Sequence, residues 1–261
     1  MRRFAAWCVV VLVLASCSSS GTVLEVDEGP MVYVPMGNSL MFTPTVPAGS
    51  SVLDLYGAML AEDFGVEVDT RDRTVGGQRT DDFLSRLQNS DPLRSDLAEA
   101  DVVTFVIPFD EWAEPAETIS GADGRDPADC GGGDGQQCLR DMITNYNMLV
   151  DQIFEELLTI VDPTKQVILV QDFYQLHTER QGEATQLLYS YFEQAQLHTQ
   201  EVAAEYGIPA ALVWDDFMGT DGEIPNLVEG GLVETDGIHP TAEGAQRIAD
   251  LYHDLGYELS S

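Results

Sequence analysis

Residues 102–107 read VVTFVI, a continuous apolar run that indicates a β-strand buried on both of its faces. Strands of this kind are typical of parallel sheets that helices cover on both sides, because neither face of the strand meets water. On either side of this run in the sequence, short apolar segments predict four further strands, at 31–35, 66–68, 167–170 and 211–214. The chain is therefore expected to be an α/β protein with a five-stranded parallel sheet.

The segments between these strands carry apolar residues at helical spacing, as Leu53, Tyr56 and Leu60 illustrate. Helices are predicted at 52–64, 82–87 with Thr80 as a possible N-cap, 139–160, 184–206 and 242–255. Residues 111–137 are rich in Gly, Pro and Asp, and they predict a long loop. Alternating strands and helices without a visible repeat or second domain indicate one sheet with helices on both faces.

The amino-acid composition excludes several classes of protein and one class of partner. The 261 residues include 45 Asp and Glu against 12 Lys and Arg, so the formal net charge is −33. A hydrophobic content of 44% is ordinary for a globular chain and excludes the disordered, collagen-like and coiled-coil classes. Nucleic acid is an unsuitable partner, because phosphate binding needs Lys and Arg to replace counterions.

The first residues have the pattern of an export signal. Arg2 and Arg3 precede an apolar run at 4–15, which is shorter than the ~20 residues that a membrane-spanning helix needs. Residues 14–17 (LASC) resemble the lipobox of bacterial lipoproteins. The resemblance implies that residues 1–16 are removed, that Cys17 carries a lipid, and that the protein sits outside the cytoplasm, held to the membrane only by this anchor. The alternative is an ordinary cleaved signal that happens to contain a cysteine. Residues 17–30 are expected to form a flexible tether.

Two further cysteines, Cys130 and Cys138, are eight residues apart in a glycine-rich segment. In an exported chain such a pair predicts a disulfide that closes a small loop. A zinc site is the weaker interpretation, because two cysteines without nearby histidines cannot fill four positions. The aspartates of the same loop do not have the spacing of an EF-hand, so a solvated acidic loop is favoured over a calcium site: Asp123, Asp126, Asp129 and Asp134. No metal or cofactor is predicted.

Ligands of open parallel sheets bind beyond the carboxyl ends of the strands. That rule selects four segments: 37–40, 76–77, 108–111 and 236–239. Among them, Ser39, His239 and Asp236 supply a hydroxyl nucleophile, a base and a group to orient the base. The three-residue spacing lets Asp236 and His239 share one tight turn. Backbone N–H groups of Ser39 and Gly77 are candidate donors to an oxyanion.

Three of these segments resemble the sequence blocks of SGNH (GDSL-type) hydrolases. They are 32–40 (VYVPMGNSL, with Asn38 where the family usually has Asp), 75–81 (VGGQRTD) and 236–240 (DGIHP, followed by TAEG). The resemblance runs from about residue 31 to 255 and implies a single domain at 31–261. It implies a flavodoxin-like three-layer α/β/α sandwich that hydrolyses esters without a metal. Position by position, Ser39 is then the nucleophile, His239 the base, Asp236 its orienting group and Gly77 an oxyanion donor.

One block departs from the family. Residues 106–111 (VIPFDE) place Asp110 where the family has an Asn that donates to the oxyanion. An ionised carboxylate cannot donate, and loss of one such donor costs ~10²–10³ in rate. Three outcomes stay open. Asp110 is protonated because of burial and donates to the oxyanion, backbone N–H groups alone stabilise the oxyanion, or the enzyme is slow or inactive.

The leading interpretation is a lipid-anchored extracytoplasmic serine esterase. Its substrate would be a small-molecule, lipid or carbohydrate-linked ester. The alternatives are a non-catalytic surface module that binds a glycan or a partner through the same cleft, and an acyltransferase that moves acyl groups between sugars.

Overall fold

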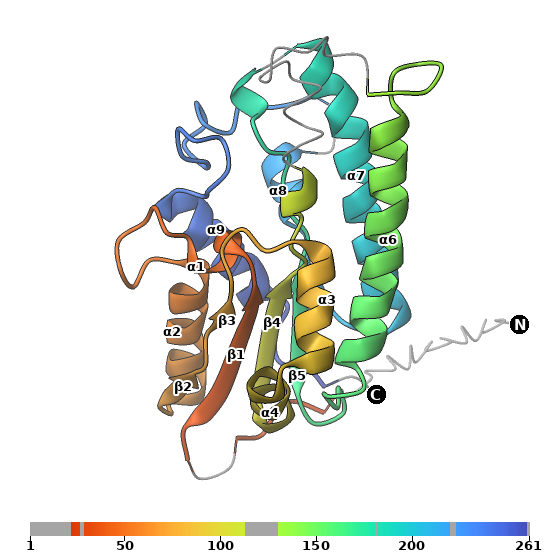
Figure 1. Cartoon of the computed structure of the whole chain (residues 1–261). Coiled ribbons are helices and arrows are strands. Elements are labelled where there is room, and N and C mark those ends of the chain that lie inside the picture. The colour runs from red at the N-terminus through yellow and green to blue at the C-terminus, as the bar shows by residue number, and fades with distance from the viewer. Residues whose placement is uncertain (1–21, 27–28, 113–129, 181, 220–222, 260–261) are drawn as a thin grey trace, which may run out of the picture.

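A parallel sheet forms the centre of the structure, a computed structural model that describes residues 22–26, 29–112, 130–180, 182–219 and 223–259 (Figure 1). Its strands are β1 (Met31–Gly37), β2 (Val68–Thr70), β3 (Arg73–Thr74), β4 (Val102–Val106), β5 (Val167–Gln171) and β6 (Ala210–Ala211). The spatial order is β2-β1-β4-β5-β6, and β3 also pairs with β1. Every strand pair is parallel, so the carboxyl ends of the strands meet at one edge.

Helices cover both faces of this sheet, as Figure 1 shows. Helices α2 (Val52–Phe64) and α9 (Ala242–Asp254) pack on one face, where the ring of Tyr33 from β1 contacts Tyr56 of α2. Helices α3 (Thr80–Asn89), α6 (Gln137–Leu157) and α7 (Glu183–Glu205) pack on the other face, where Phe105 of β4 meets Phe154 of α6. The predicted three-layer α/β/α sandwich is therefore confirmed.

The prediction of five strands was wrong by one. Strands β2 and β3 lie one after the other along β1: Val68 pairs with Met31, and Arg73 pairs with Met36. The sixth strand thus continues the same edge and does not widen the sheet. A strand of two residues is too short to carry a hydrophobic period, so the sequence pattern did not indicate it. β2 itself begins at Val68, where the predicted strand ended.

The strand predicted at 211–214 is also corrected. Only Ala210–Ala211 pairs with β5, and helix α8 (Val213–Met218) follows at once. The cause is Asp172, a fully buried carboxyl just after β5 whose Oδ1 accepts the backbone N–H of Trp214 at 2.8 Å. This contact caps the first turn of α8 from a distant part of the chain. The apolar residues at 211–214 therefore predicted a strand, whereas a tertiary contact with Asp172 stabilises a helix there.

Asp172 makes stability depend on pH. Burial raises its pKa to about 7, although hydrogen bonds from Trp214 and Gln200 oppose the rise. A carboxyl with a raised pKa stabilises the fold below the unfolded-state pKa, and this contribution disappears as pH rises through about 7. Asp172→Asn should therefore become more stable relative to wild type from about pH 4 to pH 8, by ~4 kcal/mol at most. Urea midpoints at several pH values measure this difference, and a difference that does not change with pH would contradict the assignment.

All five predicted helices are present, and the bounds of four of them differ from the prediction by one to three residues. The helix expected at 82–87 is α3, which begins at Thr80, so this residue lies inside the helix and does not cap it. Its hydroxyl instead donates to the carbonyl of Pro108 at 2.6 Å, which ties α3 to the segment after β4. A further helix, α4 (Asp91–Glu99), was not predicted, although Pro92 in its first turn is a start signal.

The predicted N-terminal tether differs from the structure at residues 22–26. Val23 forms an antiparallel bridge with Glu258, and the N–H of Leu24 donates to the carbonyl of Tyr257 at 3.0 Å. Leu24 is buried, so this short segment packs onto the domain. The predicted signal at 1–16 and the lipid site Cys17 lie outside the described residues.

The predicted Cys130–Cys138 disulfide is present, with 5.5 Å between the two Cα atoms. It closes the turn before α6, where Asp134 forms an ion pair with Arg140 at 2.8 Å. The other aspartates of the predicted acidic loop lie outside the described residues. Among the described helices, none combines the length and apolar character that a membrane span requires.

Candidate active site

Ser39 lies where β1 turns into a four-residue helix, α1 (Ser39–Phe42). The strand ends at Gly37, whose φ of +118° is unfavourable for a residue with a side chain. A Cβ at this position would also lie 2.5 Å from the carbonyl oxygen of Val106. Asn38 then caps α1, because its Oδ1 accepts the N–H of Leu40 at 3.1 Å. This sharp turn at the carboxyl end of β1 presents a half-buried Ser39.

His239 and Asp236 share the tight turn before α9, as the sequence predicts. Oδ1 of Asp236 accepts the backbone N–H groups of Ile238 and His239 at 2.9 and 3.0 Å. Its Oδ2 lies 2.7 Å from Nδ1 of His239. Nε2 of the same ring lies 2.9 Å from the Oγ of Ser39. The structure thus brings together three side chains from opposite ends of the chain in one hydrogen-bonded series.

The charge of Asp236 determines how the protons are arranged. Partial burial raises its pKa, but hydrogen bonds from the His239 side chain and from two backbone N–H groups outweigh burial and hold the pKa below its usual value. Asp236 is therefore ionised at neutral pH and can only accept. A neutral His239 must then carry its proton on Nδ1, which leaves Nε2 free to accept the hydroxyl proton of Ser39.

Sequence reasoning missed the segment that supports this turn. The hydroxyl of Tyr174 donates to the carbonyl of Ile238 at 2.6 Å, and the backbone N–H of His177 donates to the carbonyl of Gly237 at 2.8 Å. Both residues follow β5. His177 has a φ of +55°, which is uncommon for a residue other than glycine. The sequence did contain a signal for Tyr174 and His177, because both follow a strand end, and the same rule selected Ser39.

Gly77 lies in the turn after β3. This turn runs beside the end of β1, because the N–H of Val75 donates to the carbonyl of Gly37 at 2.8 Å. Gly77 is exposed, has a φ of +66°, and would have no atom within 4 Å of an added Cβ. A side chain at position 77 would therefore point into open space, and the role of Gly77 as an oxyanion donor stays a prediction.

Asp110 begins a 3-10 turn (Asp110–Trp112) after β4. Its Oδ2 accepts a hydrogen bond from Nδ2 of Asn38 at 3.2 Å. Burial raises the pKa of Asp110, while the hydrogen bond from Asn38 and the charge of His239 act in the opposite direction. The residue that departs from the family pattern is thus in contact with the residue next to Ser39.

Phe109, just before this turn, and Trp112, its last residue, are buried among other aromatic side chains. Phe109 stacks on Phe173 with ring centroids 3.6 Å apart, and Trp112 packs on Phe192. The remaining histidines make contacts away from Ser39. His253 of α9 pairs with Asp63 of α2 at 2.8 Å, and His198 is described below.

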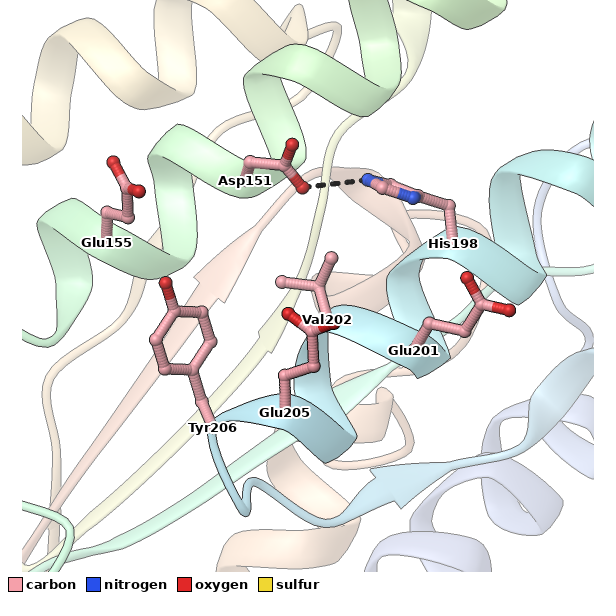
Figure 2. A pocket seen from close by; sticks show the side chains of 7 residues that line it. All are labelled: Asp151, Glu155, His198, Glu201, Val202, Glu205 and Tyr206. Carbon is pink, nitrogen blue, oxygen red and sulfur yellow. Dashed lines mark hydrogen bonds and ion pairs between the residues drawn. The ribbon is translucent and has the colours of Figure 1, made fainter.

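A cavity of about 340 Å³ lies elsewhere, between α6 and α7 (Figure 2). Two of the residues that line it, His198 of α7 and Asp151 of α6, are hydrogen-bonded to each other, with Nε2 and Oδ1 2.8 Å apart. Four carboxylates contribute to its lining, which consists of Asp151, Glu155, His198, Glu201, Val202, Glu205 and Tyr206. The lining contains no serine, cysteine or threonine to act as a nucleophile, so the chemistry points to Ser39.

Comparison with solved structures finds the same fold. The lipase Lip_vut3 from a goat rumen metagenome has a TM-score of 0.68 at 15% identity, covering 87% of this chain and 98% of its own. An extracellular lipase from Streptomyces rimosus has a TM-score of 0.54 at 16% identity, covering 86% and 99%. A lipase/acylhydrolase from Enterococcus faecalis has a TM-score of 0.53 at 13% identity, covering 86% and 94%.

No curated protein sequence matches the chain. The sequence model of the GDSL-like Lipase/Acylhydrolase family, in contrast, matches residues 36–247, which include Ser39, Asp236 and His239. This match covers most of the chain, and the protein is therefore a member of the GDSL-like lipase/acylhydrolase family.

Proposed function

We propose that this protein is a serine esterase that hydrolyses carboxylic esters, with Ser39 as nucleophile, His239 as general base and acid, and Asp236 as the group that orients His239. The observation that carries the proposal is the series of two hydrogen bonds, at 2.9 Å from Ser39 to His239 and at 2.7 Å from His239 to Asp236. These lengths allow proton transfer without rearrangement of the side chains.

The proposed reaction has two halves. Nε2 of His239 takes the proton of Ser39 as Oγ bonds to the ester carbonyl carbon, and the electron pair of the broken π bond moves to the carbonyl oxygen. The tetrahedral intermediate collapses with loss of the alcohol, which receives the proton from His239. Water then attacks the acyl-enzyme by the same proton transfers and releases the carboxylic acid. Ionised Asp236 stabilises the imidazolium in both halves.

The developing oxyanion needs donors, for which the backbone N–H groups of Ser39 and Gly77 are the proposed candidates. The open space where a Cβ of residue 77 would lie supports this assignment, because a substrate can approach Gly77 from that side. The substrate class is proposed as a small-molecule, lipid or carbohydrate-linked ester.

We also propose that the protein acts outside the cytoplasm, attached to a membrane by a lipid on Cys17. The support is the basic and then apolar N-terminal sequence that ends in LASC at residues 14–17. Acyl chains contribute ~0.8 kcal/mol per buried CH₂, so more than one chain on Cys17 would keep the protein on the bilayer.

Product analysis tests the proposed function. Purified protein is incubated with p-nitrophenyl acetate or p-nitrophenyl octanoate, and both p-nitrophenol and the free acid are quantified. Equal amounts of the two products, at a rate well above that without protein, are expected. Acyl groups recovered on an added sugar in place of free acid would instead indicate an acyltransferase, and folded protein that releases neither product would contradict the proposal.

Asp110 favours one second candidate, a surface module with little or no turnover that binds a glycan or partner through the same cleft. An ionised carboxylate beside the reaction site would repel an oxyanion. This candidate predicts ligand binding that Ser39→Ala leaves unchanged.

A further inference from the structure

A hydrogen bond joins the turn that carries Ser39 to the turn that follows β4. Nδ2 of Asn38 donates to Oδ2 of Asp110 at 3.2 Å, while Oδ1 of Asn38 accepts the N–H of Leu40. Both polar groups of the Asn38 side chain are therefore used, and the side chain is 2% exposed. Asn38 has a fixed orientation and presents an N–H donor to the carboxyl of Asp110.

Neighbouring residues in the sequence also hold Asp110 in place. Phe109, immediately before it, stacks on Phe173, and the angle between the two ring planes is 18°. Two residues later, the N–H of the buried Trp112 donates to the carbonyl of Phe109 at 2.9 Å. Anchors on both sides, together with Asn38, fix the position of the carboxyl beside the Ser39 turn.

The protonation state of Asp110 decides what it does to a neighbouring oxyanion. An ionised carboxylate only accepts and repels negative charge, whereas a neutral carboxylic acid has one O–H to donate. Partial burial disfavours the charged form. Among the described side chains, the facing groups are Asn38, which is neutral and donates, and His239, whose charge favours ionised Asp110.

We propose that Asp110 acts as a neutral carboxylic acid that donates its O–H to the oxyanion, that Asn38 is the positioning residue for this acid, and that activity declines once Asp110 ionises. The inference rests on the proposed esterase mechanism. The N–H group of Asn38 suits a positioning residue, because a carboxyl oxygen of Asp110 can accept a hydrogen bond from it in either protonation state. The side chain thus keeps its orientation while its charge changes with pH.

In the proposed step Asp110 keeps its proton. The electron pair of the carbonyl π bond moves to oxygen as Oγ of Ser39 bonds to carbon, the serine proton moves to His239, and the O–H of Asp110 forms a hydrogen bond to the new oxyanion. Electrons and protons balance without a further reactant.

The rate at which a fluorophosphonate labels Ser39 tests the inference, because phosphonylation also needs the base and a donor to the phosphoryl oxygen. In this reaction Oγ bonds to phosphorus, fluoride leaves and the serine proton moves to His239. Rates are measured for wild type and Asp110→Asn from about pH 4 to pH 9. The ratio of variant to wild type at each pH cancels the pH effects that the two proteins share, so a ratio that changes with pH reports on residue 110.

The ratio should stay near one at low pH, where both side chains donate, and should rise tenfold per pH unit once Asp110 ionises. The expected plateau is a ratio of ~10²–10³, the usual effect of one oxyanion donor. A ratio that is independent of pH, or a variant slower than wild type at every pH, would overturn the inference. If wild type is not labelled at any pH, the esterase proposal itself fails, so the two failures are distinguishable.

Asn38→Ser supplies the second variant. Serine also caps helices, which preserves the turn, but its shorter side chain cannot reach Asp110. The hydrogen bond from Asn38 lowers the pKa of Asp110, so its removal raises that pKa. The alkaline decline of labelling should therefore move to higher pH in Asn38→Ser. An unchanged midpoint would show that Asn38 does not act through Asp110, and far-UV circular dichroism confirms that each variant is folded.

Discussion

Ser39→Ala is expected to lower kcat/KM for p-nitrophenyl acetate by about 10⁴-fold or more, because the variant lacks the oxygen that forms the acyl-enzyme. The Ser39 hydroxyl bonds to His239 across the site, whereas α1 is capped by Asn38. The substitution should therefore leave the fold intact, with a melting temperature close to that of wild type.

Ser190→Ala is the matched control for this variant. Ser190 is an exposed serine on α7 whose hydroxyl donates to the carbonyl of Leu187 at 2.9 Å, and its removal should leave kcat/KM within about twofold. If Ser39→Ala retained the activity of the Ser190→Ala control, another group would have to be the nucleophile.

Asp236→Asn should lower kcat/KM by about 10³–10⁴-fold through a change of tautomer. The backbone N–H groups of Ile238 and His239 hold one oxygen of residue 236, so an asparagine keeps its oxygen there and turns its NH₂ toward Nδ1 of His239. Nδ1 must then accept, the ring proton moves to Nε2, and Nε2 can no longer accept the proton of Ser39. Activity against p-nitrophenyl acetate at about pH 7 measures the loss.

The chain contains a matched control for this loss as well. Asp63 and His253 form a carboxylate–imidazole pair at 2.8 Å with no serine hydroxyl among its contacts in the described residues. Asp63→Asn should change kcat/KM by less than about twofold. Equal effects of Asp63→Asn and Asp236→Asn would show that Asp236 acts only on stability.

The central strands could be predicted because burial on both faces leaves a continuous apolar run, as at Val102–Val106 and Val167–Gln171. The edge strands β3 and β6 contain two residues each, which is too few to produce a period. Helix α8 depends on a cap from Asp172, about forty residues earlier in the chain, and no local pattern records such a contact.

At the active site, too, local sequence patterns could be predicted and tertiary contacts could not. Ser39 could be selected because it follows a strand end, and Asp236 and His239 because their three-residue spacing fits one tight turn. The contact between Asn38 and Asp110 joins residues 72 positions apart, and only folding reveals that the two departures from the family pattern face each other. The support that Tyr174 and His177 provide to the 236–239 turn is likewise a tertiary contact.

The most direct test of an activated Ser39 is to locate the adduct that a fluorophosphonate forms on the folded protein. After labelling at neutral pH, the protein is digested and its peptides are analysed by mass spectrometry. The proposed mechanism predicts one adduct per chain, on the peptide that contains Ser39, and none on the same peptide from His239→Ala. Folded wild-type protein that stays unlabelled, or that carries its adduct on another residue, would contradict it.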